Sequence, residues 1–496
     1  MKKFICLHGH FYQPPRENPW TGKVEPEPSA APFHDWNERI SKECYQANAQ
    51  APILDESGQI AERVNNFASI SFDIGPTLLS WLKAKDPATY QAILEADQKS
   101  VRERNGHGNA IAQAYNHLIM PLASRRDKVT QVIWGIRDFE FHYKRKPEGM
   151  WLPETAVDRE TLSVLAEHGI LFTILSSHQA SRMRHLGIGS RWQALEHESI
   201  DTKQPYRIVL DQGRQLHLFF YDAPISREIA FGGLLNNGDQ LAHRLTSAFG
   251  WRDRQQLVSV AVDGETFGHH HHFGEMAVAY ALKKITREGH ARPTNFGEFL
   301  KHYGSFWEVD IHERSSWSCV HGVERWHSDC GCCINSKEGA DQRWRAVLRE
   351  SFDFLKGIVD DIFDSQGALL VKDPWEARND YIRVLLEDSP GERANFLRKH
   401  AIKELDPEEE VKVWDLLEAE RLSLFMFTSC GWFFDELSGI EPALVMKFAA
   451  RAMQRIRPYA SEGFEGNFFN ILRHAKSSDP AQGTGEDIFK RNTHGF

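Results

Sequence analysis

Short apolar segments separated by helical patterns run through the first half of this 496-residue chain. Each segment is rich in β-branched or aromatic residues, as buried parallel strands are. We expect strands at residues 3–7, 68–72, 131–135, 170–175, 206–210, 216–221 and 257–262. Because helical stretches such as 160–169 lie between them, the pattern predicts a parallel α/β fold.

The second half of the chain has helical patterns only. Residues 341–363, 406–427 and 441–456 carry apolar side chains at the i, i+3, i+4, i+7 spacing of amphipathic helices. The sequence therefore predicts four parts: an α/β domain (1–310), a connecting segment rich in Cys, His and Trp (311–340), a helical region (341–475) and a tail (476–496) that we expect to be loosely ordered.

Charge and hydropathy exclude several classes of protein. The net charge of −10 argues against a nucleic-acid binder, which would carry a basic surface. No segment approaches the roughly 18 apolar residues of a membrane span. The apolar run at the N-terminus is broken by His8 and His10, so it is too short for a signal peptide, and we expect a cytoplasmic protein. Seven cysteines, an odd number in a long chain, do not indicate a disulfide framework.

Two carboxylates follow predicted or probable strand ends. Glu154 comes just after one such segment, and Asp263 stands at the end of the strand expected at 257–262. Residues at the carboxyl ends of barrel strands face the active site. Retaining glycosidases need such a pair, because one carboxylate attacks the anomeric carbon and the other protonates the leaving oxygen. The alternative is that each carboxylate caps a helix, and spacing alone leaves both readings open.

His8 and His10 form an H-x-H pair directly after the first expected strand. On extended backbone both rings point the same way. They suit a metal ion, donors to sugar hydroxyls, or an ordinary loop. The run from His269 to His272 is a weaker metal candidate, because adjacent residues do not all point at one ion.

The connecting segment holds a second group of possible metal ligands. Thiol and imidazole groups are soft ligands, and the segment contains enough of them to bind zinc. It lacks, however, the two separated C-x-x-C pairs of common zinc fingers. We therefore expect reduced buried cysteines, or a redox-sensitive pair, in preference to a structural metal. The group consists of Cys319, His321, His327, Cys330, Cys332 and Cys333.

Five segments resemble, in order, the five conserved regions of glycoside hydrolase family 57. The third and fourth are the most specific, since they carry that family's nucleophile and acid/base. The stretch YDAPISREIAF (221–231) is also similar to the family. The five segments are HGHFYQPP (8–15), GHGN (106–109) leading to HLIMP (117–121), WLPE (151–154), DGETFG (263–268) and TSCGWFFDE (428–436).

The resemblance implies a distorted seven-stranded parallel β/α barrel followed by an all-helical region. It also implies a retaining enzyme that acts on α-linked oligo- or polysaccharides by hydrolysis or transfer, without a cofactor or metal. By resemblance, the nucleophile is Glu154 and the acid/base is Asp263. We expect the apolar neighbours of Asp263, together with Glu265, to raise its pKa. The residues expected to bind the sugar are His8, His10, His117, Trp151, Glu265 and Trp432.

The possible metal ligands His8 and His10, and two departures from the family pattern, keep other functions open. Asn109 stands where the second region normally has Glu, and Gly431 stands where the fifth often has Asp. One alternative is a metal-dependent sugar deacetylase or α-mannosidase-like hydrolase that uses His8, His10 and Asp263 as ligands. The other is an inactive glycan-binding barrel. The cysteine-rich and helical parts resemble an uncharacterised branch of the family, whose longer members continue beyond the end of this chain.

Overall fold

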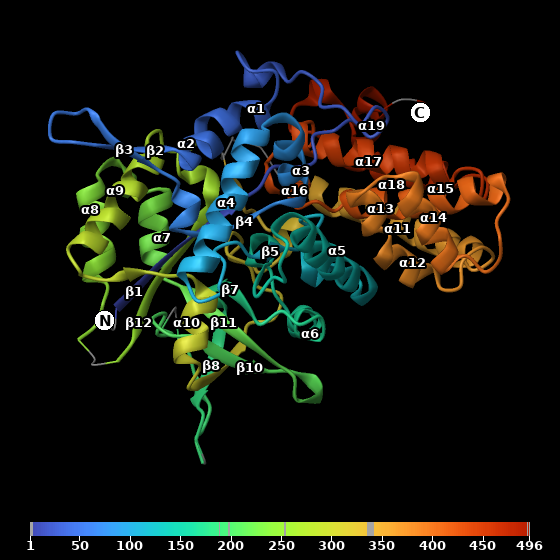
Figure 1. Cartoon of the computed structure of the whole chain (residues 1–496). Coiled ribbons are helices and arrows are strands. Elements are labelled where there is room, and N and C mark those ends of the chain that lie inside the picture. The colour runs from blue at the N-terminus through green and yellow to red at the C-terminus, as the bar shows by residue number, and fades with distance from the viewer. Residues whose placement is uncertain are drawn as a thin grey trace. The chain divides into compact units, whose positions relative to one another are not determined.

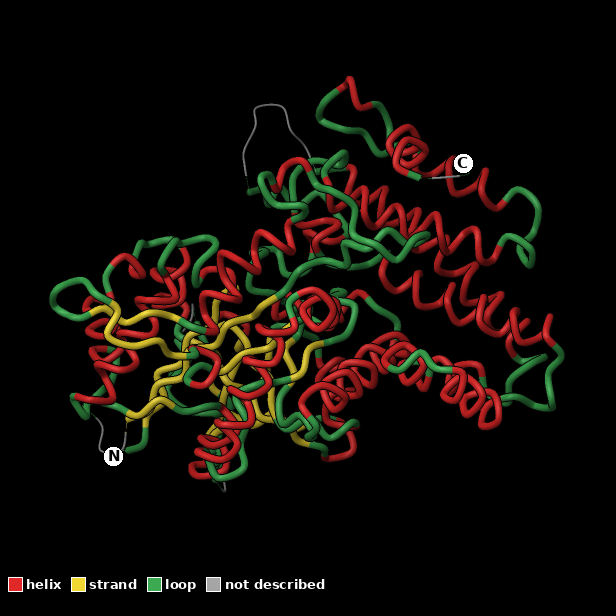
Figure 2. The backbone as a smooth tube through the Cα atoms, turned by 45° about the horizontal axis from the view of Figure 1, so that its top comes forward, coloured by secondary structure: helices red, strands yellow, loops and turns green. Residues whose placement is uncertain are grey.

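The computed structural model describes residues 3–187, 189–196, 199–251, 254–334, 342–493 and 495 (Figure 1). The chain forms two compact units, and neither is continuous in sequence. Figure 2 shows the strands gathered in the first unit, while the second is helical. Unit 1 consists of Met1–Gln13, Glu25–Gln113 and Phe139–Glu313, and unit 2 of Pro14–Val24, Ala114–Asp138 and Arg314–Phe496.

A central strand organises unit 1. This strand, β1 (Lys3–Phe11), is buried on both faces from Phe4 to its end. It has three parallel neighbours: β12 (Gln256–Asp263), β4 (Ser71–Ile74) and, at its start, β13 (Arg292–Pro293).

Further parallel pairs continue from these strands. The pairs are β5 (Ala112–Gln113) with β6 (Met150–Trp151), and β7 (Phe172–Ser176) with β11 (Gln215–Tyr221). Single parallel bridges, Phe72 with Ala110 and Gly149 with Phe172, connect β4 towards β5 and β6 towards β7. After β11, the backbone N–H of Asp222 donates to the carbonyl of Ser259 in β12, at 2.8 Å.

Unit 1 contains antiparallel as well as parallel strand pairs, so the fully parallel arrangement expected from the sequence is not what forms. The segment expected as a parallel strand at 206–210 forms β10 (Tyr206–Val209), which runs antiparallel to β11. Gln212 and Gly213 have φ values of 58° and 74°, and this tight turn reverses the chain between the two strands. Other strands complete the mixed sheet and a separate hairpin: β8 (Ala180–His185), β9 (Gln193–Ala194) and β14 (Trp307–Ile311), and β2 (Ala51–Leu54) with β3 (Ile60–Val64).

Helices with clear caps follow the strands of unit 1. In the expected helix at 160–169, the Asp158 carboxylate accepts the backbone N–H of Thr161 at 2.7 Å, and Gly169 ends the turn with φ 82°. Helix α7 packs on β12, and α8 packs on α9 (Figure 1). The helices are α1 (Trp36–Ile40), α2 (Gln46–Ala49), α3 (Pro76–Lys85), α4 (Pro87–Glu103), α6 (Arg159–Glu167), α7 (Ala223–Ala230), α8 (Gly238–Ser247), α9 (Gly274–Arg287) and α10 (Phe296–Tyr303).

The strand predicted at 131–135 is wrong, because these residues lie within helix α5 (Arg125–Tyr143). Val132 and Trp134 are fully buried there. A short apolar run does not distinguish a strand from one turn of a buried helix, and the length of the whole element decides.

Unit 2 confirms the three helices expected in the second half of the chain, and none of the described helices is long and apolar enough to cross a membrane. The tail is more ordered than expected: Thr484 and Asp487 form a capping box that starts a helix. The helices are α11 (Trp344–Gly367), α12 (Pro374–Asp380), α13 (Ile382–Leu386), α14 (Pro390–His400), α15 (Pro407–Phe425), α16 (Cys430–Phe433), α17 (Ile440–Ile456), α18 (Phe464–Leu472) and α19 (Gly485–Asn492).

A buried ionic cluster lies among the helices of unit 2. The Arg378 guanidinium donates to Asp127 and to Glu420, both at 2.8 Å, and the Lys356 ammonium lies 3.3 Å from Glu420. Arg378 and Glu420 are completely buried. Each charge therefore depends on its partners, because a buried charge without one is very costly.

Candidate active site

Strand β1 brings His8 and His10 to one face of unit 1. In the parallel register, His8 stands opposite Ser71 of β4, while His10 stands between Asp73 of β4 and Asp263 of β12. Side chains at the same register level of neighbouring strands share a face. The register therefore aligns three of these polar side chains across three adjacent strands.

Asp73 joins the two histidines, although no sequence pattern indicated it as a site residue. Its Oδ2 lies 2.8 Å from Nδ1 of His10, and its Oδ1 lies 3.0 Å from Nε2 of His8. Ser71 Oγ lies 3.1 Å from the other ring nitrogen of His8. All four residues are buried, so the carboxylate is the fixed acceptor for both rings. A polar residue near the end of the apolar stretch at 68–72 was the available signal.

The two histidines differ in charge because of their surroundings. Burial lowers the pKa of His8 more than its contacts with Asp73 raise it, so this ring is neutral. Burial also acts against charge on His10, but the charge and hydrogen bond of Asp73, with the charges of Asp263 and Glu265, raise the pKa of His10 to about 9. His10 is therefore an imidazolium at neutral pH.

Trp151, the last residue of β6, is fully buried against both rings. Its ring centroid lies 5.0 Å from that of His8 and 5.0 Å from that of His10, at interplanar angles of 23° and 19°. The indole thus fixes the orientation of the two imidazoles. A direct contact between Trp151 and a sugar stays a prediction.

Glu154 lies on a strained turn after β6. Glu154 and Thr155 both have left-handed backbone, with φ values of 58° and 49°, a conformation that is costly for residues other than glycine. Hydrogen bonds around Gln179 hold this turn, because its amide contacts the hydroxyl and the carbonyl of Thr155, both at 2.9 Å. The side chain of Glu154 is half-buried.

Asp263, at the end of β12, has the properties of a proton donor. Surrounding protein atoms raise the pKa of its carboxyl to about 6; the His10 cation opposes this rise, and the charges of Glu154 and Asp73 support it. The side chain nevertheless keeps an exposed surface. A bound ligand would displace the remaining water and raise the pKa of Asp263 further.

Glu265 is a second perturbed carboxyl close to Asp263. Burial raises the pKa of Glu265 to about 7, although the hydroxyl of Tyr45 donates to it at 2.6 Å and opposes the rise. The backbone N–H of Tyr12 also donates to Glu265, at 3.1 Å. The group therefore holds a fixed position, and its predicted role in shaping a sugar subsite stays a prediction.

The two remaining predicted site residues, His117 and Trp432, belong to unit 2. Nδ1 of His117 lies 2.7 Å from the hydroxyl of Ser429. Trp432 is 1% exposed, packs against Phe352, and donates its indole N–H to the carbonyl of Arg345 at 3.2 Å. These contacts give Trp432 a packing function within its unit, and a sugar-binding role for either residue stays a prediction.

Both departures from the family pattern have structural explanations. The Asn109 amide is buried, donates to the carbonyl of Phe67 at 3.0 Å, and accepts from Asn295 at 3.1 Å, so both of its ends are used. At Gly431, a Cβ atom would come within 2.9 Å of two methyl carbons of Val445. Neither position is shaped for a catalytic acid.

The metal alternative receives no geometric support at this face. Among the described residues, the one group of three or more His, Cys, Asp or Glu side chains close enough to share an ion lies in the connecting segment. His8 and His10 instead direct ring nitrogens at Asp73. The histidine run also disperses, since His269 pairs with Glu43 and His271 with the carbonyl of Ala230.

The chain matches a known family and is similar in fold to several solved structures. A family model described as glycosyl hydrolase family 57 matches residues 13–306, a range that includes both candidate carboxylates, Glu154 and Asp263, and starts after His10. A second model, described as a domain of unknown function (DUF3536), matches residues 341–495. A search of curated proteins found no match to the chain.

Three solved structures are similar to the chain in fold. They are an exo-type maltose-forming amylase from Pyrococcus sp. ST04 (18% identity, TM-score 0.71, 95% of this chain and 83% of that chain), a branching enzyme from Thermococcus kodakaraensis (14%, 0.55, 99% and 94%) and an α-amylase from Thermotoga maritima (11%, 0.56, 99% and 99%). At these identities the likeness concerns the fold alone.

Proposed function

Because the chain belongs to glycosyl hydrolase family 57, we propose that it is a retaining hydrolase or transferase of α-linked glucans, with Glu154 as nucleophile and Asp263 as acid/base. The observation that carries the proposal is the perturbed carboxyl of Asp263. Its pKa, raised to about 6, responds to the charges of Glu154, His10 and Asp73. The proposed donor therefore retains a proton nearer to neutral pH than an ordinary aspartate does.

The chemistry proceeds in two steps. A carboxylate oxygen of Glu154 attacks the anomeric carbon while Asp263 gives its proton to the departing glycosidic oxygen, so the leaving sugar is released as an alcohol. The Asp263 carboxylate then removes a proton from water or from a sugar hydroxyl, and that oxygen displaces Glu154 from the anomeric carbon. Asp263 is protonated again, and the configuration is retained.

The surrounding residues suit these two roles. The left-handed backbone at Glu154 and Thr155, held by Gln179, gives the nucleophile a rigid base. The imidazolium of His10, fixed by Asp73, is a strong donor for a sugar hydroxyl beside Asp263. We infer that this cation also limits the rise in the pKa of Asp263, so the group can lose its proton during turnover.

We also propose that the parallel strands of unit 1 close into a distorted seven-stranded barrel. The pairing of β1 with β4 and β12, the bridges at Ala110 and Gly149, and the hydrogen bond from Asp222 to Ser259 support this arrangement. In a barrel, carboxyl ends of strands such as β6 and β12 point to one face.

Cytoplasmic location stays a prediction from the sequence, which cell fractionation would test.

Product analysis tests the proposed function. Wild type is incubated with maltooligosaccharides and a panel of α-glucans beside Glu154→Gln and Asp263→Asn. Glu95→Gln, which changes an exposed carboxylate on α4, serves as the control. We expect shorter or rearranged glucans from wild type and control, and losses of at least about 10²–10⁴-fold in both site variants. Inert wild type on every α-glucan would overturn the substrate assignment.

Chemical rescue distinguishes the two carboxylates. With an activated aryl α-glucoside, the leaving group needs little protonation, so Asp263→Ala should still form the glycosyl-enzyme. Azide should then intercept this intermediate in Asp263→Ala and give the α-glycosyl azide. In Glu154→Ala, azide should replace the missing nucleophile and give the β-glycosyl azide. The opposite pattern would exchange the two roles.

A further inference from the structure

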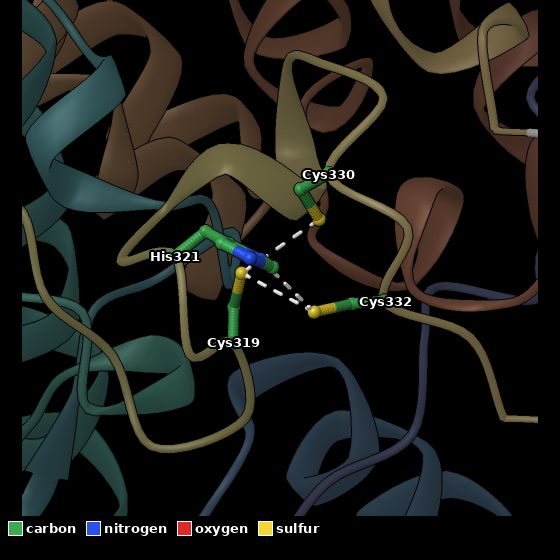
Figure 3. Close-up of side chains that lie close together, drawn as sticks. All are labelled: Cys319, His321, Cys330 and Cys332. Carbon is green, nitrogen blue, oxygen red and sulfur yellow. Dashed lines mark hydrogen bonds between the residues drawn. The ribbon is translucent and has the colours of Figure 1, made fainter.

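Four side chains of the connecting segment converge on one point within unit 2 (Figure 3). Their ligand atoms all lie within 4.8 Å of one another. Sγ of Cys319 is 3.9 Å from that of Cys330 and 3.8 Å from that of Cys332, and Cys332 Sγ is 3.6 Å from Nδ1 of His321.

These spacings match the edges of a zinc coordination tetrahedron. With Zn–S bonds of about 2.3 Å and a Zn–N bond of about 2.0–2.1 Å, tetrahedral geometry requires S–S separations of about 3.8 Å and an S–N separation of about 3.6 Å. A disulfide would bring two sulfurs to about 2.05 Å. The observed separations therefore correspond to ligands around an ion rather than to an oxidised pair.

We propose that Cys319, His321, Cys330 and Cys332 bind one Zn²⁺ ion in a tetrahedral Cys₃His site. Four protein ligands leave no open coordination position, so the site is structural rather than catalytic. The sequence favoured reduced buried cysteines or a redox-sensitive pair, because the segment lacks two separated C-x-x-C pairs; the ligand pairs here are C-x-H and C-x-C.

The backbone of the segment forms two tight turns that present the two ligand pairs. Gly322, next to His321, has φ 83°, and a Cβ atom there would lie 2.3 Å from the carbonyl of Arg314. Its N–H donates to the carbonyl of Cys319 at 3.1 Å. Gly331, between Cys330 and Cys332, has φ 75°. Both turns use conformations that favour glycine, as compact metal-binding loops require.

The charges around the cluster also favour a divalent cation. Cys319 is buried, so a thiolate at this position needs a nearby positive charge. Three thiolates, a neutral imidazole and Zn²⁺ leave one net negative charge. The positive charge of the buried Arg325 acts on Cys332, and Arg345 donates to the carbonyl of Cys332 at 2.8 Å.

The structure separates these four residues from two others in the same segment. The ring of His327 pairs with Glu324 at 3.2 Å, and Cys333 is exposed next to the cluster. Neither belongs to the convergent group. Both provide matched controls that change the same residue types within a few positions of the proposed ligands.

The ion would stabilise a loop of unit 2 through Arg345. The guanidinium of this buried residue contacts the carbonyls of Cys332 and Phe434, while its own carbonyl accepts the indole N–H of Trp432. The backbone N–H of Ile334 also donates to Asp435, at 2.9 Å. Zinc bound at Cys332 would therefore hold the segment that follows α16.

The first experiment measures metal in the full-length chain, purified without a histidine tag under reducing conditions from zinc-supplemented cells. We expect about one zinc ion per chain by mass spectrometry. Cobalt(II) added to the chelator-treated protein should give the intense visible bands of tetrahedral coordination and a thiolate charge-transfer band. Cys319→Ser and Cys332→Ser should lose both signals, whereas Cys333→Ser and His327→Gln should keep both and melt at the wild-type temperature.

A second variant makes the test independent of folding defects in the serine variants. His321→Cys should retain zinc and shift the cobalt bands, because a fourth thiolate replaces the imidazole. A folded wild-type chain that takes up neither zinc nor cobalt would overturn the proposal. Equal loss of metal in Cys333→Ser would overturn the ligand assignment. None of these measurements depends on glycosidase activity, so the two proposals fail separately.

Discussion

Replacing Asp73 by Asn should remove the pH dependence that His10 gives to the stability of the protein. The change keeps the size and shape of the side chain but removes the charge that His8 and His10 share. His10 is 4% exposed, so its imidazolium depends on the charge of Asp73. Once that charge is removed, burial favours the neutral ring. We expect the pKa of His10 to fall from about 9 to below the ordinary value of 6.5.

The size of the effect follows from proton linkage. Below pH 6.5, His10 is protonated in both the folded and the unfolded protein, and its raised pKa contributes its full stabilisation. Between pH 6.5 and 9 only the folded protein keeps this proton, so stability falls as pH rises. With a folded pKa of about 9, raising the pH from 7 to 9 should cost wild type about 2 kcal/mol through this group.

Urea unfolding at pH 7 and pH 9 measures the difference between wild type and variant. Asp97→Asn is the control, because it removes a buried carboxylate paired with Arg145, whose charge does not titrate in this range. The control should be destabilised but keep the wild-type dependence on pH. If Asp73→Asn loses as much stability between pH 7 and 9 as wild type does, the reasoning about His10 is refuted.

Three further predictions concern the site and unit 2. His10→Gln should raise the pKa of Asp263 above about 6, since the cation lowers it, and shift the alkaline limb of the kcat/KM profile upward. Arg378→Met should leave two buried carboxylates without their guanidinium and reduce the free energy of unfolding by about 3–5 kcal/mol in urea titrations. Gly431→Ala should lower the Tm by overpacking, and adding Val445→Ala should restore part of it.

Each of these has its own contrary result. An unchanged or lowered alkaline limb in His10→Gln would mean that another group controls the protonation of Asp263. A loss below about 1 kcal/mol in Arg378→Met would mean that water or rearranged side chains satisfy the carboxylates. Additive effects of the Gly431 and Val445 changes would show that the two positions do not share one packing contact.

The sequence predicted the strands where composition and length were both decisive. The segments that became β1, β7 and β12 are short apolar runs, and each is buried along almost its whole length. Residues 131–135 have a similar composition, yet they form little more than one turn of the longer helix α5. Composition does not reveal direction either, and the turn at Gly213 makes β10 antiparallel. Both predictions failed because the length of an element and the direction of a strand depend on residues outside the short apolar segment.

The candidate site likewise has features that the sequence indicates and features that only the fold shows. The positions of Glu154 and Asp263 follow from short sequence patterns, but Asp73 becomes visible only when the register places it beside His10. The left-handed backbone at Glu154 has no sequence signal, because glutamate rarely adopts it. The convergence of Cys319 with Cys332 depends on how an irregular loop folds, which residue spacing does not determine.

The discontinuous course of unit 2 has a consequence for its synthesis. Segments Pro14–Val24 and Ala114–Asp138 leave the ribosome long before the helices that complete their unit. The Trp20 indole donates to Gln454 of α17, and the Trp134 indole donates to the carbonyl of Arg378 in α12. Each indole therefore gains its partner only after hundreds of further residues have been synthesised. The nascent chain thus exposes apolar surface during most of its synthesis. In a fragment that ends at residue 310, the same surface would stay exposed. Chaperone dependence during expression, and insolubility of such a fragment, are the expected signs.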